Sequence, residues 1–185
     1  MANVNADNVL LGAPNIMGGV FVGTTKSPLP TDAKTKLDPS FICAGYVSDD
    51  GIEEKSDIKS ESVKAWGGVT VCTYVSEAKI EYKITFIESL NEEALKLFHG
   101  DENVTNNNGK IAINMNSSGK TVKAFVIQLF DKKAETRIVI PKGQVTSTGG
   151  IKYKHDTAIG YEVTITALVD TAGNNVYKYI EKTNK

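Results

Sequence analysis

Apolar and polar residues alternate along residues 79–86 and 159–169, and this period of two constrains the fold more than any other feature of the chain. Successive side chains of a β-strand point to opposite faces, so strict alternation is typical of a strand with one buried and one solvated face. In residues 79–86 the apolar positions are Ile80, Tyr82, Ile84 and Phe86, and Lys79, Glu81, Lys83 and Thr85 lie between them. The sequence therefore predicts a chain built mainly from β-sheet.

Other segments also have strand character. We predict further strands over residues 69–75, 110–115, 122–130, 136–140 and 176–180. Residues 124–130 are apolar on nearly both faces, as expected of a central strand. Residues 171–175 (Thr-Ala-Gly-Asn-Asn) tolerate positive φ, which predicts a hairpin turn that pairs the last strand with the strand before it.

One α-helix is predicted after residue 89. Ser89 and Glu92 have the spacing of a capping box, in which each side chain accepts a hydrogen bond from a free backbone N–H of the first turn. Gly100 is placed to end the helix in a left-handed conformation. A one-sided apolar stripe is formed by Leu90, Ala94, Leu97 and Phe98.

Short strands with one helix predict a mainly β fold, a β-sandwich or small barrel with one lateral α-helix. A length of 185 residues fits a single domain over residues 1–185. We expect two extensions from it. Residues 1–40, approximately, form an extended N-terminal arm or loop in which Pro28 and Pro30 block regular structure. Residues 49–61, approximately, form a long charged excursion or solvated hairpin.

The charge of the chain limits its partners. The formal net charge is −1, and Arg137 is the only arginine. No dense cationic patch of the kind that grips nucleic acid or an anionic membrane is visible. The N-terminal residues lack a signal-peptide pattern and no run approaches the roughly 20 apolar residues of a membrane-spanning helix, so residence in the cytoplasm is expected. Cys43 and Cys72 are then expected to be reduced, buried core residues.

We find no constellation in the sequence that predicts catalysis, a cofactor or a metal. Ser117-Ser118-Gly119-Lys120-Thr121 resembles the end of a phosphate-binding loop. Asn114 stands where that motif needs glycine, and a strand rather than a helix is predicted to follow, so we interpret the segment as a turn. His99 and His155 each lack a second ligand at a helical or hairpin spacing. We therefore expect that the chain is not an enzyme.

Trp66, the only tryptophan, has two interpretations. A tryptophan next to predicted strands can anchor the core or a sheet edge of its own chain. It can also anchor a contact between subunits, because tryptophan is enriched where buried interface contacts carry the binding energy. The sequence leaves both open.

Several motifs together resemble the major tail tube proteins of long, non-contractile-tailed phages. They occur in this order: Val9-Leu10-Leu11-Gly12-Ala13-Pro14, Gly18-Gly19-Val20-Phe21-Val22, Pro28-Leu29-Pro30-Thr31-Asp32-Ala33, residues 44–51 (Ala-Gly-Tyr-Val-Ser-Asp-Asp-Gly), Lys64-Ala65-Trp66-Gly67-Gly68 and residues 95–105. The set spans most of the chain, and the β-rich prediction with one lateral helix agrees with that family's fold.

The resemblance implies a structural subunit that forms hexameric rings, which stack into a hollow conduit for DNA delivery. It implies as partners other copies of the chain, together with tape-measure and tail-terminator or initiator proteins. DNA is expected to pass without specific binding, and no membrane binding is expected. The location implied is the tail of the virion, assembled in the host cytoplasm.

The resemblance also suggests which residues carry these roles. Arms and excursions would order on a neighbouring copy, since free sheet edges and long arms need partners. The candidate inter-subunit residues are Val9, Leu10, Leu11, Pro28, Leu29, Pro30, Asp49, Asp50, Ile52 and Trp66. A polar or acidic lumen would avoid holding DNA phosphates. The candidate lumen-lining residues are Glu81, Thr85, Glu162, Thr164 and Thr166.

Two alternatives remain. A monomeric β-sandwich that binds a receptor or carbohydrate would display clustered aromatic residues, for which Tyr153, Tyr177 and Tyr179 are the only candidates. A tube protein of a type VI secretion system or of a contractile tail would share the predicted architecture. Ring or tube formation distinguishes the first alternative, and neighbouring genes distinguish the second.

Overall fold

The structure is a computed structural model that describes residues 4–14, 19–116 and 119–183. Within these ranges the chain forms one α-helix, α1 (Glu92–His99), and short 3-10 turns at Ala6–Asn8 and Asp101–Asn103. The strands are β1 (Ala13–Pro14), β2 (Val20–Thr24), β3 (Ile42–Cys43), β4 (Val47–Lys64), β5 (Thr70–Phe86), β6 (Val104–Asn107), β7 (Lys110–Ile113), β8 (Lys123–Phe130), β9 (Ala134–Thr148), β10 (Tyr161–Ala167) and β11 (Tyr177–Lys182). The prediction of a mainly β fold with a lateral helix is confirmed.

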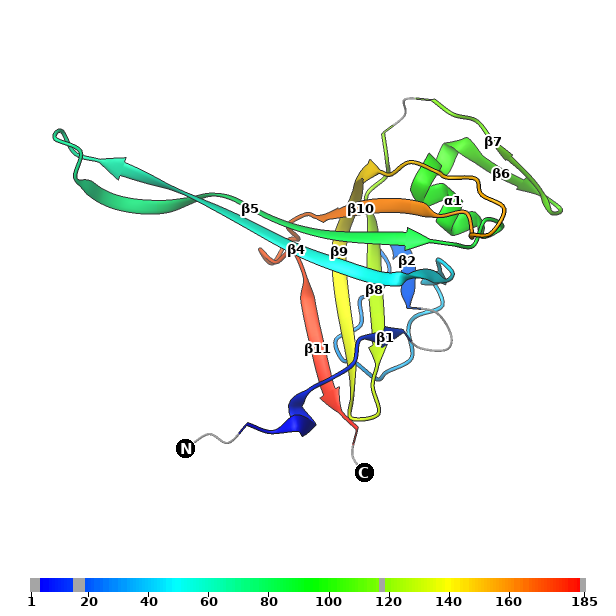
Figure 1. The fold of residues 1–185 in the computed structure, drawn as a ribbon, viewed down its shortest axis with the longest axis horizontal. Helices are drawn as coiled ribbons and strands as arrows, with labels where there is room; N and C mark the ends of the chain where they lie inside the picture. The colour runs from blue at the N-terminus through cyan, green and yellow to red at the C-terminus, as the bar shows by residue number, and fades with distance from the viewer. Residues whose placement is uncertain (1–3, 15–18, 117–118, 184–185) are drawn as a thin grey trace.

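A single antiparallel sheet bends into two layers. Its strand order is β3-β2-β8-β9-β10-β5-β4, with β1 added on β8 and β11 on β9. Strand β9 belongs to both layers, because its first half pairs with β8 and β11 and its second half pairs with β10. In Figure 1, β2, β8, β9 and β11 run across the direction of β10, β5 and β4. The layers therefore cross as in an orthogonal sandwich.

Two residues of β9 lie where the strand changes partners. Pro141 has no N–H to give to a ladder, so it suits a break in the pairing. Gly143 lies so close to Phe125 that an added Cβ would be 2.6 Å from that ring. Glycine at this corner lets β9 pass close to β8 while it turns from one layer to the other.

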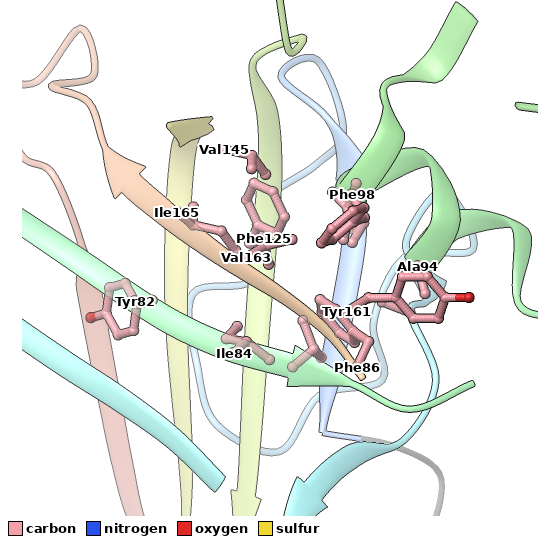
Figure 2. Close-up of a cluster of buried hydrophobic side chains, with 14 of the residues drawn as sticks. Tyr82, Ile84, Phe86, Ala94, Phe98, Phe125, Val145, Tyr161, Val163 and Ile165 are labelled. Carbon is pink, nitrogen blue, oxygen red and sulfur yellow. The ribbon is translucent and has the colours of Figure 1, made fainter. Parts of the chain in front are cut away.

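The core fills the space between the layers (Figure 2). Its largest contributions come from Tyr82, Ile84, Phe86, Phe125, Ile127, Ile140, Val163 and Ile165, all of them at most 1% exposed. Helix α1 closes one end, where the Phe98 ring meets the Tyr161 ring edge-on at a centroid distance of 5.4 Å. Each fully buried side chain of this size contributes about 1.5–3 kcal/mol to stability.

The predicted helix is present, but its cap is not the predicted one. Asn91, rather than Ser89, is the N-cap, and its side chain accepts hydrogen bonds from the N–H groups of Glu93 and Ala94. Leu90 is 84% exposed, so its assignment to the buried stripe was wrong. Gly100 ends the helix at φ 104° and ψ 146°, which is positive in φ but outside the left-handed helical region.

Several strand predictions require correction. Residues 69–75 and 79–86 form one continuous strand, β5, and β9 runs far beyond the predicted residues 136–140. The last strand pairs with β9, not with its predecessor β10, so residues 171–175 do not form a hairpin turn. The long β9 has an open side along its first half, and β11 occupies it. The prediction that residues 124–130 are central is confirmed, since β8 lies between β2 and β9.

Three further predictions concern the N-terminal arm, the two cysteines and the turn at residues 117–121. Val20 and Val22 of β2 are buried beside β8, so this part of the predicted N-terminal arm is a core strand. Cys72 is exposed and Cys43 is half-buried, so the prediction of two buried cysteines was wrong. Ser117 and Ser118 of the predicted turn lie outside the described residues. The strand expected after that turn is present as β8.

Candidate functional site

The β4–β5 hairpin extends far beyond the two-layer body of the molecule (Figure 1). Every residue in residues 58–78, which we call the outer hairpin, is exposed. Residues 49–61 form most of one strand of a β-hairpin that continues past them, because β5 accompanies β4 to its end. A two-stranded ribbon without further cover is marginally stable in water. The outer hairpin therefore has the features of a segment that needs a partner.

The outer hairpin carries an apolar face that continues the face buried in the body. Ile58 lies opposite Ala78, and Ser60 lies opposite Val75 across a register shift. The shift is a β-bulge that absorbs one residue of β5, so Val75 falls on the same face as Ala78 and as the core residues of the inner part of β5. Val75 is 58% exposed, and Ile58 is 66% exposed. An apolar face that continues past the core marks an interaction surface.

The opposite side of the β4, β5 and β10 layer is polar, and it brings the five candidate lumen residues together. Thr166 lies opposite Glu81 and Glu162 lies opposite Thr85. The Thr166 hydroxyl donates to Glu81 Oε1 at 3.3 Å, and Lys83 Nζ lies 2.9 Å from Glu162 Oε2. We call this surface the polar face. Whether it lines a channel stays a prediction.

Opposite charges alternate along the polar face. Lys59 pairs with Glu77 at 2.6 Å, and Lys79 pairs with Glu81 at 2.7 Å. The carboxylates of Glu53, Asp57, Glu77, Glu81 and Glu162 face the ammonium groups of Lys55, Lys59, Lys79 and Lys83 along the register of these strands. Glu61, opposite Tyr74, lies on the same face, so the carboxylates outnumber the ammonium groups by two and the face is mixed and weakly acidic.

In the loop with Pro28, Leu29 and Pro30, the first two are exposed and Pro30 is half-buried, and the loop is anchored just after them. Arg137 of β9 is 1% exposed, and its guanidinium donates to the carbonyl oxygens of Asp32 and Thr35, each at 2.9 Å. The loop is therefore ordered on its own body.

The first described residues lie along the turn between β8 and β9. The Leu11 N–H donates to Asp131 Oδ2 at 3.0 Å, and Lys133 Nζ donates to the carbonyl oxygen of Ala6 at 3.0 Å. Val9 and Leu11 remain 65% and 74% exposed, and Leu10 is 36% exposed. These three apolar side chains thus remain open to contact with another molecule.

The remaining candidate inter-subunit residues differ in environment. Asp49 and Asp50 are exposed at the start of β4. Ile52 lies opposite Ile84 and packs against the core, so it supports the fold as well as the surface. Trp66 is 106% exposed at the tip of the outer hairpin, so the interpretation of it as a core or sheet-edge anchor was wrong.

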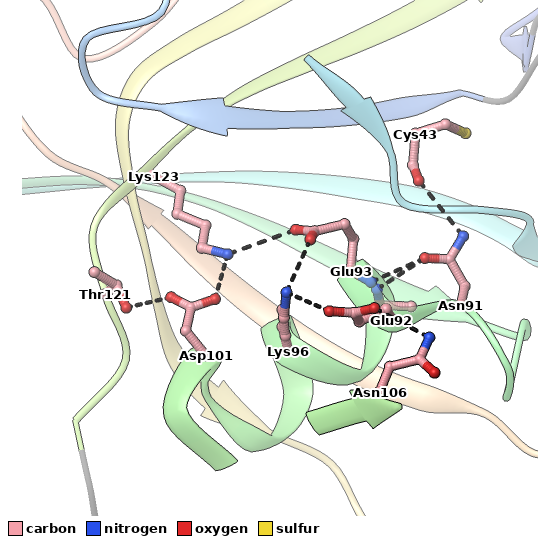
Figure 3. Close-up of polar contacts among 10 residues, drawn as sticks. Cys43, Asn91, Glu92, Glu93, Lys96, Asp101, Asn106, Thr121 and Lys123 are labelled. Carbon is pink, nitrogen blue, oxygen red and sulfur yellow. Dashed lines mark hydrogen bonds and ion pairs between the residues drawn. The ribbon is translucent and has the colours of Figure 1, made fainter. Parts of the chain in front are cut away.

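A second polar cluster covers helix α1 (Figure 3). Lys123 Nζ lies 2.5 Å from Asp101 Oδ1, and Lys96 Nζ lies 2.6 Å from Glu92 Oε1. The hydrogen bond from Lys96 lowers the pKa of Glu92. This carboxylate is held ionised by its partner, which suits an ion pair that fixes the helix and not a general acid. His155 lies in an exposed loop.

The described residues contain neither a cluster of metal ligands nor a membrane-spanning helix. In residues 4–14, 19–116 and 119–183 no three His, Cys, Asp or Glu side chains gather in a way that could hold a metal ion. Among the same residues, α1 and the two 3-10 turns are all too short or too polar to span a membrane.

Comparison with known proteins agrees with the geometry. Residues 2–185 match the family described as phage tail tube protein. The chain belongs to the phage tail tube protein family. No curated protein matches it.

Membership of the tail tube family makes the chain a structural component of a phage tail and places it in the virion. It also implies self-assembly into a tube. The sequence indicated Trp66 and the polar face, but not the apolar stripe with Ile58, Val75 and Ala78. Apolar alternation in residues 69–75 is the same for a strand that packs in its own core and for one that packs on another copy.

Proposed function

We propose that copies of this chain form hexameric rings that stack into the hollow tube of a long, non-contractile phage tail. The observation that carries the proposal is the free edge of β4. Among the described strands β4 pairs with β5 alone, over a strand of 18 residues. A long unprotected edge is a hazard for a monomer, and pairing it with another copy removes that hazard.

The same layer offers a second edge. Residues 144–148 of β9 pair with β10 on one side, while the pairing of β9 with β8 stops at Gly143. A β4 edge of one copy joined to this β9 edge of the next continues the sheet around a ring. Head-to-tail contacts of this kind close into cyclic rings, and the joined sheets form a barrel without free edges.

The polar face then lines the channel, with Glu81, Thr85, Glu162, Thr164 and Thr166 toward the lumen. Each side chain repeats in every copy, so a net positive lining would hold DNA phosphates at every ring. The alternating charges of the polar face leave no net positive charge to do so. DNA passes through without specific binding.

The remaining contacts join ring to ring and subunit to subunit. Val9, Leu10 and Leu11 lie beside the turn between β8 and β9, at one end of these strands, which suits contact with an adjacent ring. Further contacts between copies are made by Pro28, Leu29, Pro30, Asp49, Asp50, Ile52 and Trp66. Tape-measure and terminator or initiator proteins meet the ends of the assembled tube. Assembly takes place in the host cytoplasm, and the chain has no catalytic role.

Electron microscopy of the purified full-length chain tests the proposal. We expect rings or tubes at high protein concentration. In a shortened variant, Asn-Gly replaces residues 60–76 and links Lys59 to Glu77. These two residues lie opposite each other, so a two-residue turn can connect them. This variant should keep the melting temperature of the body within a few degrees and remain monomeric. Persistent monomers of the full-length chain at high concentration would overturn the proposal.

A receptor- or carbohydrate-binding monomer gains no support from the aromatic residues. Tyr177 and Tyr179 pack on the second apolar cluster with Phe41 and Val126, and Tyr153 alone of the three is exposed. A contractile tail would use the same architecture. A sheath gene beside the coding sequence would favour it, and a tape-measure gene without a sheath gene favours the non-contractile tail.

A further inference from the structure

A cavity of about 470 Å³ lies under the start of β4, between the two layers. Its volume is in the range of pockets that hold a small ligand or a large side chain. The wall is mostly apolar and is formed by Gly12, Pro14, Gly19, Val47, Gly51, Ile52, Tyr82, Ile127, Leu129 and Ile138. Ser48, Asp49 and Glu54 add the polar groups.

The cavity contains hydrogen-bonding capacity that the described part of the chain does not use. The Ser48 hydroxyl oxygen is buried and has no hydrogen-bond partner among the described residues. The Tyr82 side chain is fully buried beside Glu54, and burial together with that carboxylate raises the pKa of its hydroxyl. An unpaired buried hydroxyl is costly, so a ligand with a donor would stabilise the site.

Trp66 has the size, apolar surface and hydrogen-bond donor that suit this cavity, and its own chain leaves it exposed. It stands in a tight turn, in which the Ala65 N–H donates to the Val69 carbonyl oxygen at 2.8 Å and the Gly68 N–H donates to the Ala65 carbonyl oxygen at 2.9 Å. The turn presents the indole to solvent at 106% exposure. An indole combines a large apolar surface with one N–H donor, so it is most stable in an apolar pocket that contains an acceptor.

The hairpin cannot place Trp66 in the cavity of its own chain. Ile52 lines the cavity, and 14 residues of nearly continuous strand separate it from Trp66, a span of about 46 Å at 3.3 Å per residue. Figure 1 shows the hairpin tip at the far end of the molecule from the start of β4. The tip is therefore available only to another copy.

Charge also favours this pairing. Lys64 lies two residues before Trp66, while Asp49 and Glu54 are at the rim of the cavity. Glu54 is already paired with Lys178 at 2.6 Å, which leaves Asp49 as the partner for the incoming ammonium group.

We propose that the Trp66 indole of one copy inserts into the cavity of a neighbouring copy, where its N–H donates to Ser48 and Lys64 faces Asp49. The inference rests on the proposed tube assembly and names one contact that holds it together. Buried tryptophans at the centre of a contact commonly carry 2 kcal/mol or more, so loss of the indole should raise the protein concentration needed for assembly by roughly 30-fold.

Fluorescence of the full-length chain tests insertion, because Trp66 is its only tryptophan. Emission of the dilute monomer should be that of an indole in water. It should shift to shorter wavelength and become resistant to acrylamide as rings appear by electron microscopy. Trp66→Ala should need roughly 30-fold more protein to form rings, and Trp66→Phe should recover part of the loss.

A substitution that fills the cavity tests whether this cavity receives the Trp66 side chain. Gly12 lines it, and a Cβ added there meets no atom within 4 Å, so Gly12→Phe should fold with an unchanged melting temperature and block insertion. Gly150→Phe is the matched control, since Gly150 has the same open surroundings away from the cavity. We expect Gly12→Phe, and not Gly150→Phe, to weaken assembly as Trp66→Ala does.

Different results would overturn the insertion of Trp66 and the assembly of the tube. Rings whose Trp66 emission stays that of the monomer would overturn the insertion and leave the tube intact. Normal assembly of Gly12→Phe with shielded Trp66 would overturn this cavity as the acceptor. Wild-type protein that never forms rings would overturn both.

Discussion

The guanidinium of Arg137, fully buried in β9, donates a hydrogen bond of 2.9 Å to the main-chain oxygen of Asp32 in the loop after Pro30. A second bond of 2.9 Å reaches the main-chain oxygen of Thr35. The only arginine of the chain thus holds a loop of its own body. A buried guanidinium needs such acceptors, because a buried polar group left unpaired costs about 1–3 kcal/mol.

We expect Arg137→Ala to lower the free energy of unfolding by about 3–5 kcal/mol, since it leaves two carbonyl oxygens unpaired and a cavity in β9. Urea denaturation followed by circular dichroism measures the change. Lys36→Ala, on the exposed part of the same loop, should stay within about 0.5 kcal/mol of the wild type. Equal effects of the two substitutions would show that the loop does not depend on Arg137.

The N-cap of α1 can be tested by two substitutions close together. Asn91→Ala removes the acceptor for the N–H groups of Glu93 and Ala94, and should destabilise the chain by about 1 kcal/mol. Ser89→Ala should have little effect, because Ser89 is not the N-cap. Thermal unfolding of both variants provides the measurement, and a larger loss in Ser89→Ala would contradict the cap geometry.

Stability should fall in mildly acidic solution because of His99. Burial, together with the charge of Lys120, lowers the pKa of His99 below its ordinary value of 6.5. The folded chain then binds fewer protons than the unfolded chain. The stabilisation that comes from neutral His99 is therefore complete above pH 6.5 and is lost as the pH falls toward the pKa of His99 in the folded chain. Urea midpoints at pH 7.5 and 5.5 measure it.

His99→Gln should flatten this pH dependence between pH 7.5 and 5.5. His155→Gln, in an exposed loop, should retain it. If His99→Gln loses stability with acid as steeply as the wild type, another group is responsible.

An added positive charge on the polar face should increase the retention of DNA in the channel. Thr164 lies opposite Lys83 on this face, so Thr164→Lys places two cations side by side and lowers the excess of negative charge on the face. Assembled tubes of Thr164→Lys should bind short duplex DNA more strongly than wild-type tubes, with an affinity that falls as salt rises. Fluorescence anisotropy with labelled DNA provides the readout.

The control for this substitution is Thr25→Lys, which adds the same charge in an exposed turn after β2. We expect its tubes to bind DNA much more weakly than those of Thr164→Lys. Equal binding by both variants would contradict the placement of the polar face in the lumen.

Local patterns in the chain were sufficient for much of the fold. Alternation along residues 79–86 and 159–169 predicted β5, β10 and which of their side chains share the polar face, because side-chain direction in a strand follows directly from position. The apolar run in residues 124–130 predicted the central strand β8, and the helical stripe predicted α1.

Tertiary structure was needed wherever the answer depended on a neighbour distant in the chain. The pairing of β11 with β9, the docking of the Asp32 loop on Arg137 and the cavity under β4 each depend on segments far apart in the sequence. The exposure of Cys72 and Trp66 is of the same kind. Residues that are apolar and alternate have the same pattern whether they pack inside their own chain or on another copy, and only the arrangement of the whole chain distinguishes the two.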